Sequence, residues 1–210
     1  PSDFIKIKKI KNELNINFRL HNYFPVPKKE FVINFASTNA QIRKLSRNLV
    51  LKAIEFSNEI ESSIYGMHCG FLVDPNPKDL GKTLESEKLT DKSTAFKIFI
   101  EEVNNILISA KRYGVKIYLE NNVFSKNNFL RFKGKNPFLG CNYKELFLIK
   151  KSLPEVGILL DLAHLKVSAN SLDFDFDKEL DLILPLSDYL HLSDNNGLSD
   201  TNKVITKDTL

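Results

Sequence analysis

The sequence contains few cysteines, no long apolar run, and none of the common nucleotide-binding or serine-hydrolase motifs. Cys69 and Cys141 are too few and too far apart for a zinc ribbon or a disulfide scaffold, and we expect both to be buried free thiols in a reducing cytoplasm. No apolar run approaches the roughly 18–20 residues of a membrane span, so we expect no membrane association. The absence of GxGxxG and GxxxxGK[ST] argues against a bound nucleotide. No Gly-x-Ser-x-Gly elbow occurs either.

The charge balance is mild. The 210 residues carry a net charge of +4, with 42% hydrophobic and 27% charged residues, which is ordinary for a globular domain. The lysines are scattered through the chain among many asparagines and isoleucines. This distribution indicates a compositional bias rather than a basic face for nucleic acid, so we do not expect a nucleic-acid partner. The length suits one domain, and the sequence leaves open whether the protein forms a homo-oligomer.

Apolar segments of two kinds alternate along the chain. Some are short and almost continuously apolar, and others keep the spacing of an amphipathic helix. This alternation predicts an α/β fold with a parallel sheet covered by helices. The expected strands are 16–21, 63–68, 115–120, 156–164 and 188–192, and the expected helices are 39–61, 91–113, 143–152 and 177–184. The run "DFDFD", residues 173–177, is interpreted as a loop and helix N-cap.

Polar residues of one kind recur at the ends of the expected strands. In parallel α/β folds, the carboxyl ends of the strands meet at one edge, where ligands bind. Any one of these residues could be an ordinary hydrogen-bonded structural group, but all four histidines of the chain fall in this set. We therefore predict a shared polar site, and imidazole together with carboxylate suits a first-row divalent metal. The residues are His21, His68, Glu120, Asp161 with His164, and His191 with Asp194.

Six short segments, taken in order, resemble a known family. "LHNYFP", "VINFAS", "MHCGF", "YLENN", "LLDLAH" and "LHLSDNNGLSDTN" are similar to the xylose isomerase-like TIM-barrel superfamily, over about residues 16–202. The resemblance implies a (β/α)8 TIM barrel, with 1–210 as a single domain of this type. It further implies barrel strands two to six, with strand one before Pro1 and strands seven and eight after Leu210. We thus expect an incomplete fragment, since a whole barrel takes about 250 residues.

The resemblance also implies a metal site. Matched position by position, the family's ligands fall on Glu120, Asp161 and His191, which would bind a divalent ion such as Mn, Mg, Co or Zn. A fourth ligand, a glutamate on the last strand, has no counterpart here, because no glutamate follows Glu179. The catalytic residues would be Glu120 and His164. Glu120 would be one acid/base group and the missing glutamate the other, while His164 would lie beside the metal and contact the substrate.

The superfamily contains two kinds of enzyme, sugar isomerases or epimerases and endonuclease IV. In the nuclease branch, His21, His68 and His164 would bind additional zinc ions, together with an Asp-x-His pair. This chain reads Asp200-Thr201-Asn202 there, and an asparagine amide is a poor zinc ligand. The loop "NNVFSKNN" after Glu120 also lacks the Thr-Ala-Gly-Gln-Gly run of the nucleases. We therefore favour sugar chemistry, although "HNYFP", "VINFAS" and "HCGF" suit either branch.

The function expected from these residues is isomerisation or epimerisation of a small-molecule sugar or sugar phosphate, by proton transfer through a metal-stabilised enediolate. Two alternatives stay open: a zinc-dependent AP endonuclease, and a catalytically inactive barrel acting as a binding module. For His21 a structural role is the alternative, and for the loop from Asp194 an ordinary solvated loop. The residues expected to bind substrate are His21, His68, His164, Asn22, Asp194 and Asp200, with Asn195 and Asn196 nearby.

Overall fold

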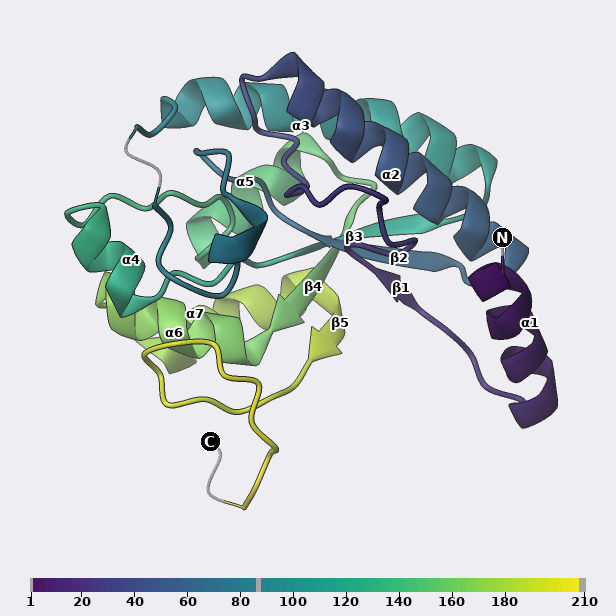
Figure 1. Cartoon of the computed structure of the whole chain (residues 1–210). Coiled ribbons are helices and arrows are strands. Elements are labelled where there is room, and N and C mark those ends of the chain that lie inside the picture. The colour runs from purple at the N-terminus through teal and green to yellow at the C-terminus, as the bar shows by residue number, and fades with distance from the viewer. Residues whose placement is uncertain (1, 86–87, 208–210) are drawn as a thin grey trace.

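A computed structural model describes residues 2–85 and 88–207 (Figure 1). Its centre is a parallel five-stranded sheet in which the strands follow one another in chain order. This is the α/β arrangement predicted from the sequence, and it forms part of a (β/α)8 barrel. The strands are β1 (Leu20–His21), β2 (Ile64–His68), β3 (Lys116–Glu120), β4 (Gly157–Asp161) and β5 (Ser187–His191).

Helices separate the strands, and α2 and α3 lie side by side across one face of the sheet, packed on β2 and β3 (Figure 1). The N-cap side chains of Asn39, Asp91 and Asn142 each accept a hydrogen bond from the first turn of α2, α3 and α5. The helices are α1 (Ser2–Leu14), α2 (Ala40–Glu59), α3 (Lys92–Arg112), α4 (Lys126–Arg131), α5 (Tyr143–Ser152), α6 (Leu162–Leu172) and α7 (Phe176–Ile183), with 3-10 turns η1 (Pro77–Asp79) and η2 (Leu184–Leu186).

The boundaries differ from expectation at two strands. The strand expected over 156–164 ends at Asp161, because the Asp161 carboxylate accepts the backbone N–H of His164 and so starts α6. His164 therefore lies in the first turn of a helix. The first strand is only Leu20–His21, and α1 was not predicted. The expected cap in 173–177 is confirmed, since Asp175 caps α7.

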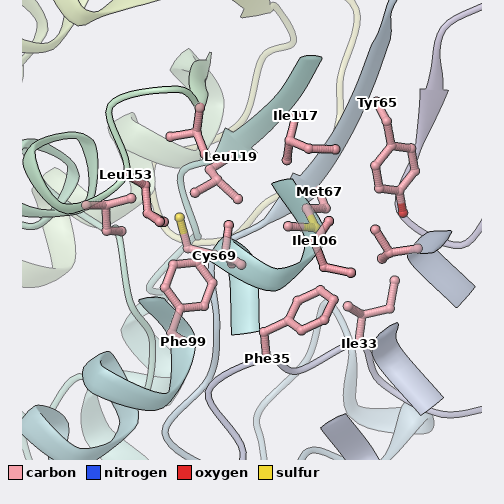
Figure 2. Close-up of a cluster of buried hydrophobic side chains, with 14 of the residues drawn as sticks. Ile33, Phe35, Tyr65, Met67, Cys69, Phe99, Ile106, Ile117, Leu119 and Leu153 are labelled. Atoms are coloured by element: carbon pink, nitrogen blue, oxygen red, sulfur yellow. The ribbon is translucent and has the colours of Figure 1, made fainter. Parts of the chain in front are cut away.

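Alternation along the strands separates a hydrophobic core from a polar site. In β2, Tyr65 and Met67 are buried in the core beside the helices, as Figure 2 shows, whereas His68 points to the opposite face. In β3, Leu119 belongs to the core and Glu120 to the other face. Burying each large apolar side chain contributes about 1.5–3 kcal/mol, so the core fixes which residues face the site.

Both cysteines are buried free thiols, as expected, and burial raises the pKa of Cys69 and of Cys141. Within residues 2–85 and 88–207, no helix has the length and apolarity needed to cross a membrane.

Candidate functional site

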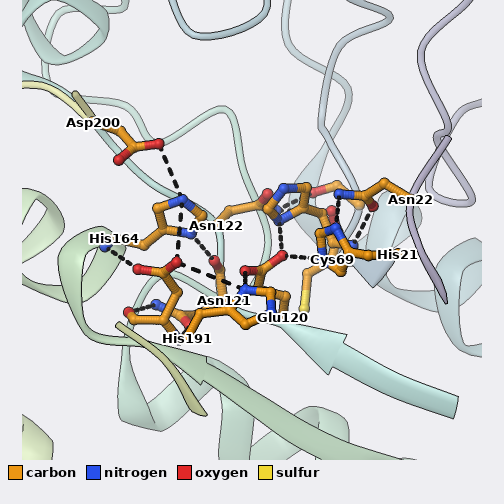
Figure 3. A network of polar contacts seen from close by, with 12 residues as sticks. His21, Asn22, Cys69, Glu120, Asn121, Asn122, His164, His191 and Asp200 are labelled. Atoms are coloured by element: carbon orange, nitrogen blue, oxygen red, sulfur yellow. Dashed lines mark hydrogen bonds and ion pairs between the residues drawn. The ribbon is translucent and has the colours of Figure 1, made fainter. Parts of the chain in front are cut away.

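Glu120 is the centre of the polar site. It is the last residue of β3, only 1% exposed, and three imidazoles surround its carboxylate (Figure 3). Its Oε2 lies 2.7 Å from His21 Nε2 and 3.1 Å from His68 Nδ1, and its Oε1 lies 2.8 Å from His191 Nδ1. These histidines come from the ends of β1, β2 and β5. The structure thus brings to Glu120 residues that are up to 99 positions away from it in the chain.

The imidazoles determine the charge of this carboxylate. Burial alone raises the pKa of Glu120, but the surrounding imidazoles of His68, His191 and His21 hold that pKa well below its usual range. The hydrogen bond to Glu120 raises the pKa of His191, against the effect of burial. Burial lowers the pKa of His68 to about 4, so this ring is neutral at pH 7. Glu120 is therefore a buried carboxylate with a neutral imidazole beside it.

Asp161 and His164 lie next to this group, at the junction of β4 and α6. Asp161 Oδ2 is 3.9 Å from His191 Nδ1 and 3.9 Å from His164 Nε2. Asn121 holds both residues in place, since its Oδ1 accepts the Asp161 N–H at 2.7 Å and its Nδ2 donates to the Asp161 carbonyl at 3.0 Å. The main-chain oxygen of Asn121 lies 2.9 Å from His164 Nδ1. Sequence reasoning missed Asn121, whose only signal was its position directly after Glu120.

Asp200 completes the far side of the site. His164 Nε2 lies 3.3 Å from Asp200 Oδ2, and Asn202 Nδ2 donates to the same oxygen at 3.1 Å. Burial lowers the pKa of His164, but the hydrogen bond with Asp200 and the nearby carboxylates outweigh it and raise that pKa to about 9. The same hydrogen bond lowers the pKa of Asp200. The amide of Asn202, where the nuclease branch would have histidine, is thus engaged in orienting Asp200.

A cavity of about 200 Å³ opens beside these residues. Its lining combines polar and apolar side chains, a mixture typical of small-molecule sites. The polar residues include Asn22, His68, His164 and Asp200, and the apolar residues include Phe71, Leu80, Leu84, Val123 and Phe138.

Four of the six residues expected to bind substrate therefore line the cavity. His21 and Asp194 lie outside the lining as the structure describes it. His21 is turned toward Glu120 instead. The carboxylate of Asp194 lies 3.1 Å from Lys166 Nζ, and its backbone pairs with that of Lys203. The roles of all six residues stay predictions.

The donor atoms suit a metal ion. Among the described residues, candidate ligand atoms of His21, Glu120 and His191 lie within 4.8 Å of one another, and so do those of His68, Glu120 and His164. Imidazole nitrogen with carboxylate oxygen is a set that first-row divalent ions prefer. His68 Nδ1 is also buried without a hydrogen-bond partner among the described residues, and its 3.1 Å approach to Glu120 lacks hydrogen-bond alignment. Buried polar atoms without partners are costly, so a ligand that engages this nitrogen fits the site.

Comparison with known proteins decides the family. The family model described as "Xylose isomerase-like TIM barrel" matches residues 1–208. The chain belongs to this family. This xylose isomerase-like chain is 28% identical over 170 residues to the uncharacterized protein MJ1311 of Methanocaldococcus jannaschii, a match that covers 80% of the chain and 50% of that protein.

Solved structures show the same fold. A D-tagatose 3-epimerase-like protein has a TM-score of 0.68 and 23% identity, covering 96% of this chain and 65% of its own. D-psicose 3-epimerase, solved in the presence of D-fructose, has a TM-score of 0.63 and 16% identity, covering 91% of this chain and 57% of its own. The xylose isomerase-like chain thus spans less than two thirds of the length of these proteins and shares the fold of sugar epimerases.

Proposed function

We propose that the protein is a metal-dependent isomerase or epimerase of a sugar or sugar phosphate. The observation that carries this proposal is the buried carboxylate of Glu120, which three imidazoles surround. One of these imidazoles, that of His68, lines the neighbouring cavity together with His164. A second line of support is the family and its structural neighbours, which include epimerases of ketohexoses by name. The identities to these neighbours are too low to carry over a particular sugar.

Glu120, Asp161 and His191 are the proposed ligands of one divalent ion, such as Mn, Mg, Co or Zn. His191 Nδ1 lies 2.8 Å from Glu120 Oε1 and 3.9 Å from Asp161 Oδ2. When bound, the ion would supply Lewis-acid polarisation of the substrate carbonyl and its neighbouring hydroxyl. Asn121 supports this arrangement by fixing the backbone of Asp161.

The residues of the chain would move the proton. Glu120 is ionised, so its carboxylate oxygen can accept a proton from the substrate carbon. In an isomerisation it could return that proton to the neighbouring carbon. An epimerisation needs a second group on the opposite face, a role proposed for the glutamate that the family has on its last strand. His164 lines the cavity and, because its pKa is raised to about 9, can donate a hydrogen bond from Nε2 to a substrate oxygen. Asn22 and Asp200 offer further polar groups, while the wall containing Phe71 and Phe138 excludes water from the carbon skeleton.

A zinc-dependent AP endonuclease is the second candidate. The observation in its favour is the second possible ligand group, His68, Glu120 and His164, which shares Glu120 with the first. Against it, Asn202 stands where a nuclease would need a histidine ligand, and its amide already binds Asp200. A cluster of several zinc ions needs more ligands than a single ion does, including the histidine that Asn202 replaces. The proposed epimerase chemistry needs only one ion.

Two measurements on the full-length protein separate these functions. The first is metal content after loading with Mn²⁺, Co²⁺ or Zn²⁺, for which we expect about one ion per chain, by the ligand count of a single site. The second is incorporation of solvent deuterium into ketohexoses and their phosphates, which reports proton exchange at carbon whichever product forms. Cleavage of DNA at abasic sites by protein with about three zinc ions, without deuterium exchange into any sugar, would refute the proposal.

A further inference from the structure

The amide of Asn22 has only one orientation that satisfies its neighbours. The backbone N–H of His68 lies 3.1 Å from Asn22 Oδ1. A backbone N–H can only donate, so the amide oxygen must face it. If the amide were flipped, its NH2 group would face the N–H of His68, and two donors would point at each other. The Nδ2 group of Asn22 therefore points at His21 Nδ1, 3.1 Å away.

This orientation determines the tautomer of His21. Because an amide NH2 can only donate, His21 Nδ1 must accept, and the neutral ring then carries its proton on Nε2. His21 Nε2 lies 2.7 Å from Glu120 Oε2, so the ring donates to the carboxylate. The glycine at position 66 allows this arrangement, since a Cβ there would come within 2.8 Å of His21 Cδ2. Asn22 and Gly66 thus fix both the proton and the position of His21.

His164 is held in the opposite way. Its Nδ1 lies 2.9 Å from the main-chain oxygen of Asn121, which can only accept. Nδ1 of His164 therefore carries a proton, and Nε2 is the nitrogen that faces Asp200. The side chain of Asn22 and the main-chain oxygen of Asn121 thus determine opposite states of Nδ1, without a proton in His21 and with one in His164.

We propose that His21 is not a metal ligand but a positioning residue, whose Nε2–H holds Oε2 of Glu120 while Asn22 occupies its Nδ1. By distance alone His21 belongs to a ligand group with Glu120 and His191. A neutral histidine that binds an ion through one ring nitrogen keeps its proton on the other. In His21 the Nδ1 atom must accept from Asn22, so the proton stays on Nε2 and that nitrogen cannot bind an ion. The ring of His191 contacts Glu120 through Nδ1, and it can bind an ion there with its proton on Nε2. The ion of the proposed function is then bound on the side of Oε1, His191 and Asp161. The part of this inference that concerns the ion rests on the proposed function.

Nitrogen NMR tests the tautomer without any metal or substrate. In full-length protein labelled with ¹⁵N-histidine, long-range proton–nitrogen correlations show which ring nitrogen carries the proton, and a His21→Gln variant assigns the signals. We expect a bare Nδ1 on His21 and a protonated Nδ1 on His164. Asn22→Asp keeps an oxygen for the His68 N–H and presents a second oxygen to His21, so the proton of His21 should move to Nδ1. A protonated Nδ1 on His21 in the unaltered protein would overturn the inference.

Cobalt titration tests the ligand assignment. His21→Gln retains a donor toward Glu120 but is a poor metal ligand, so we expect its Co²⁺ affinity to stay within about threefold, while His21→Ala loses about tenfold, as for outer-shell partners. The matched variant His191→Gln removes a proposed ligand, so its loss of Co²⁺ affinity should exceed that of either His21 variant, beyond the range for outer-shell partners. Equal losses in His21→Gln and His191→Gln contradict the assignment. If the unaltered protein binds no Co²⁺, the proposed function fails, and the NMR result still decides the role of His21.

Discussion

The two halves of the site differ in what they offer to Glu120, which lies between them. The half formed by β1 and β2 contributes imidazoles only, from His21 and His68. The half formed by β4 and β5 contributes His191 together with the carboxylate of Asp161. Mixed nitrogen and oxygen donors suit divalent ions, which is why the second half is the proposed position of the ion.

The halves also differ in packing. The ring of His21 lies over Gly66 and is hydrogen-bonded at both nitrogens, whereas β5 contains no fully buried residue among Ser187–His191. Leu190, in this strand, is 42% exposed. The side chains of His21 and His191 are nevertheless exposed to the same extent, 32% and 33%, and β5 is an edge strand of the sheet. The difference that bears on Glu120 is therefore the fixed orientation of His21, to which we assign positioning of the carboxylate, while we propose that an ion binds in the second half.

The largest expected effect comes from the residue that both halves share. Glu120→Gln keeps the shape of the side chain but removes the negative charge that the imidazoles surround. We expect turnover, measured as deuterium exchange into the substrate by the full-length protein, to fall about 1,000-fold, within the usual range for a lost general base. Retained turnover would remove Glu120 from the catalytic role.

A matched control separates the loss of the site from the loss of a buried carboxylate. Glu102 is also a buried acid, but it pairs with Arg43 and Arg47 in the helical layer, away from the site. Glu102→Gln should lower the free energy of unfolding in urea and leave turnover per folded molecule unchanged.

The next effect should be confined to the second half. Asn121→Ala removes both hydrogen bonds to the backbone of Asp161, and leaving a buried backbone group unsatisfied costs about 1–3 kcal/mol. We expect metal affinity, measured by titration, to fall 10- to 100-fold, because outer-shell partners orient ligands. The exposed Asn104 on α3 is the control. Asn104→Ala should change neither the free energy of unfolding nor the metal affinity measurably. An unchanged metal affinity in Asn121→Ala would mean that the two hydrogen bonds from Asn121 do not position Asp161, or that Asp161 is not a ligand.

The sequence predicted where the site would be but not how its parts are oriented. Strand-end residues such as His68 and Glu120 were predictable, because continuous apolar strands with polar ends imply a common edge. The start of α6 was not, because Asp161 is both the end of an apolar run and a helix cap, and only three-dimensional contact shows the second role. Helix α1 was missed because its run "IKIKKIKNEL" is rich in lysine, and of its apolar residues Phe4 and Ile7 pack on the core.

The direction of hydrogen bonds is even harder to predict from the sequence than the boundaries of helices. Nothing in the order of residues says that Asn22 faces His21 with its nitrogen, since that follows from a backbone N–H forty-six positions away in the chain. The same holds for Asn202, whose residue type was informative but whose bond to Asp200 was not predictable.

A smaller effect should be confined to the first half. In Gly66→Ala the added methyl group meets His21 Cδ2 at 2.8 Å, so we expect the ring to shift and its hydrogen bond to Glu120 to weaken. We expect a loss of about 1–3 kcal/mol in unfolding free energy from overpacking, and less than a tenfold loss of metal affinity. Gly157→Ala is the matched control, since its methyl group meets the ring of Tyr118 instead. Both variants should be less stable in urea, but only Gly66→Ala should shift the ¹⁵N signals of His21. Equal shifts in the two variants would contradict a local effect.

The smallest expected effect concerns Asn202. Its backbone has a φ of 45°, in the left-handed region, so Asn202→Gly removes the amide without adding backbone strain. Asp200 then loses the hydrogen bond from Asn202 Nδ2 but keeps His164 as a partner, and an exposed hydrogen bond of this kind contributes about 0.5–1.5 kcal/mol. Since Asp200 lines the cavity, we expect the KM for the sugar to rise about threefold, which corresponds to the lower part of that range, with kcat nearly unchanged. A loss of bound metal in Asn202→Gly would instead place this amide among the ligands and reopen the nuclease interpretation.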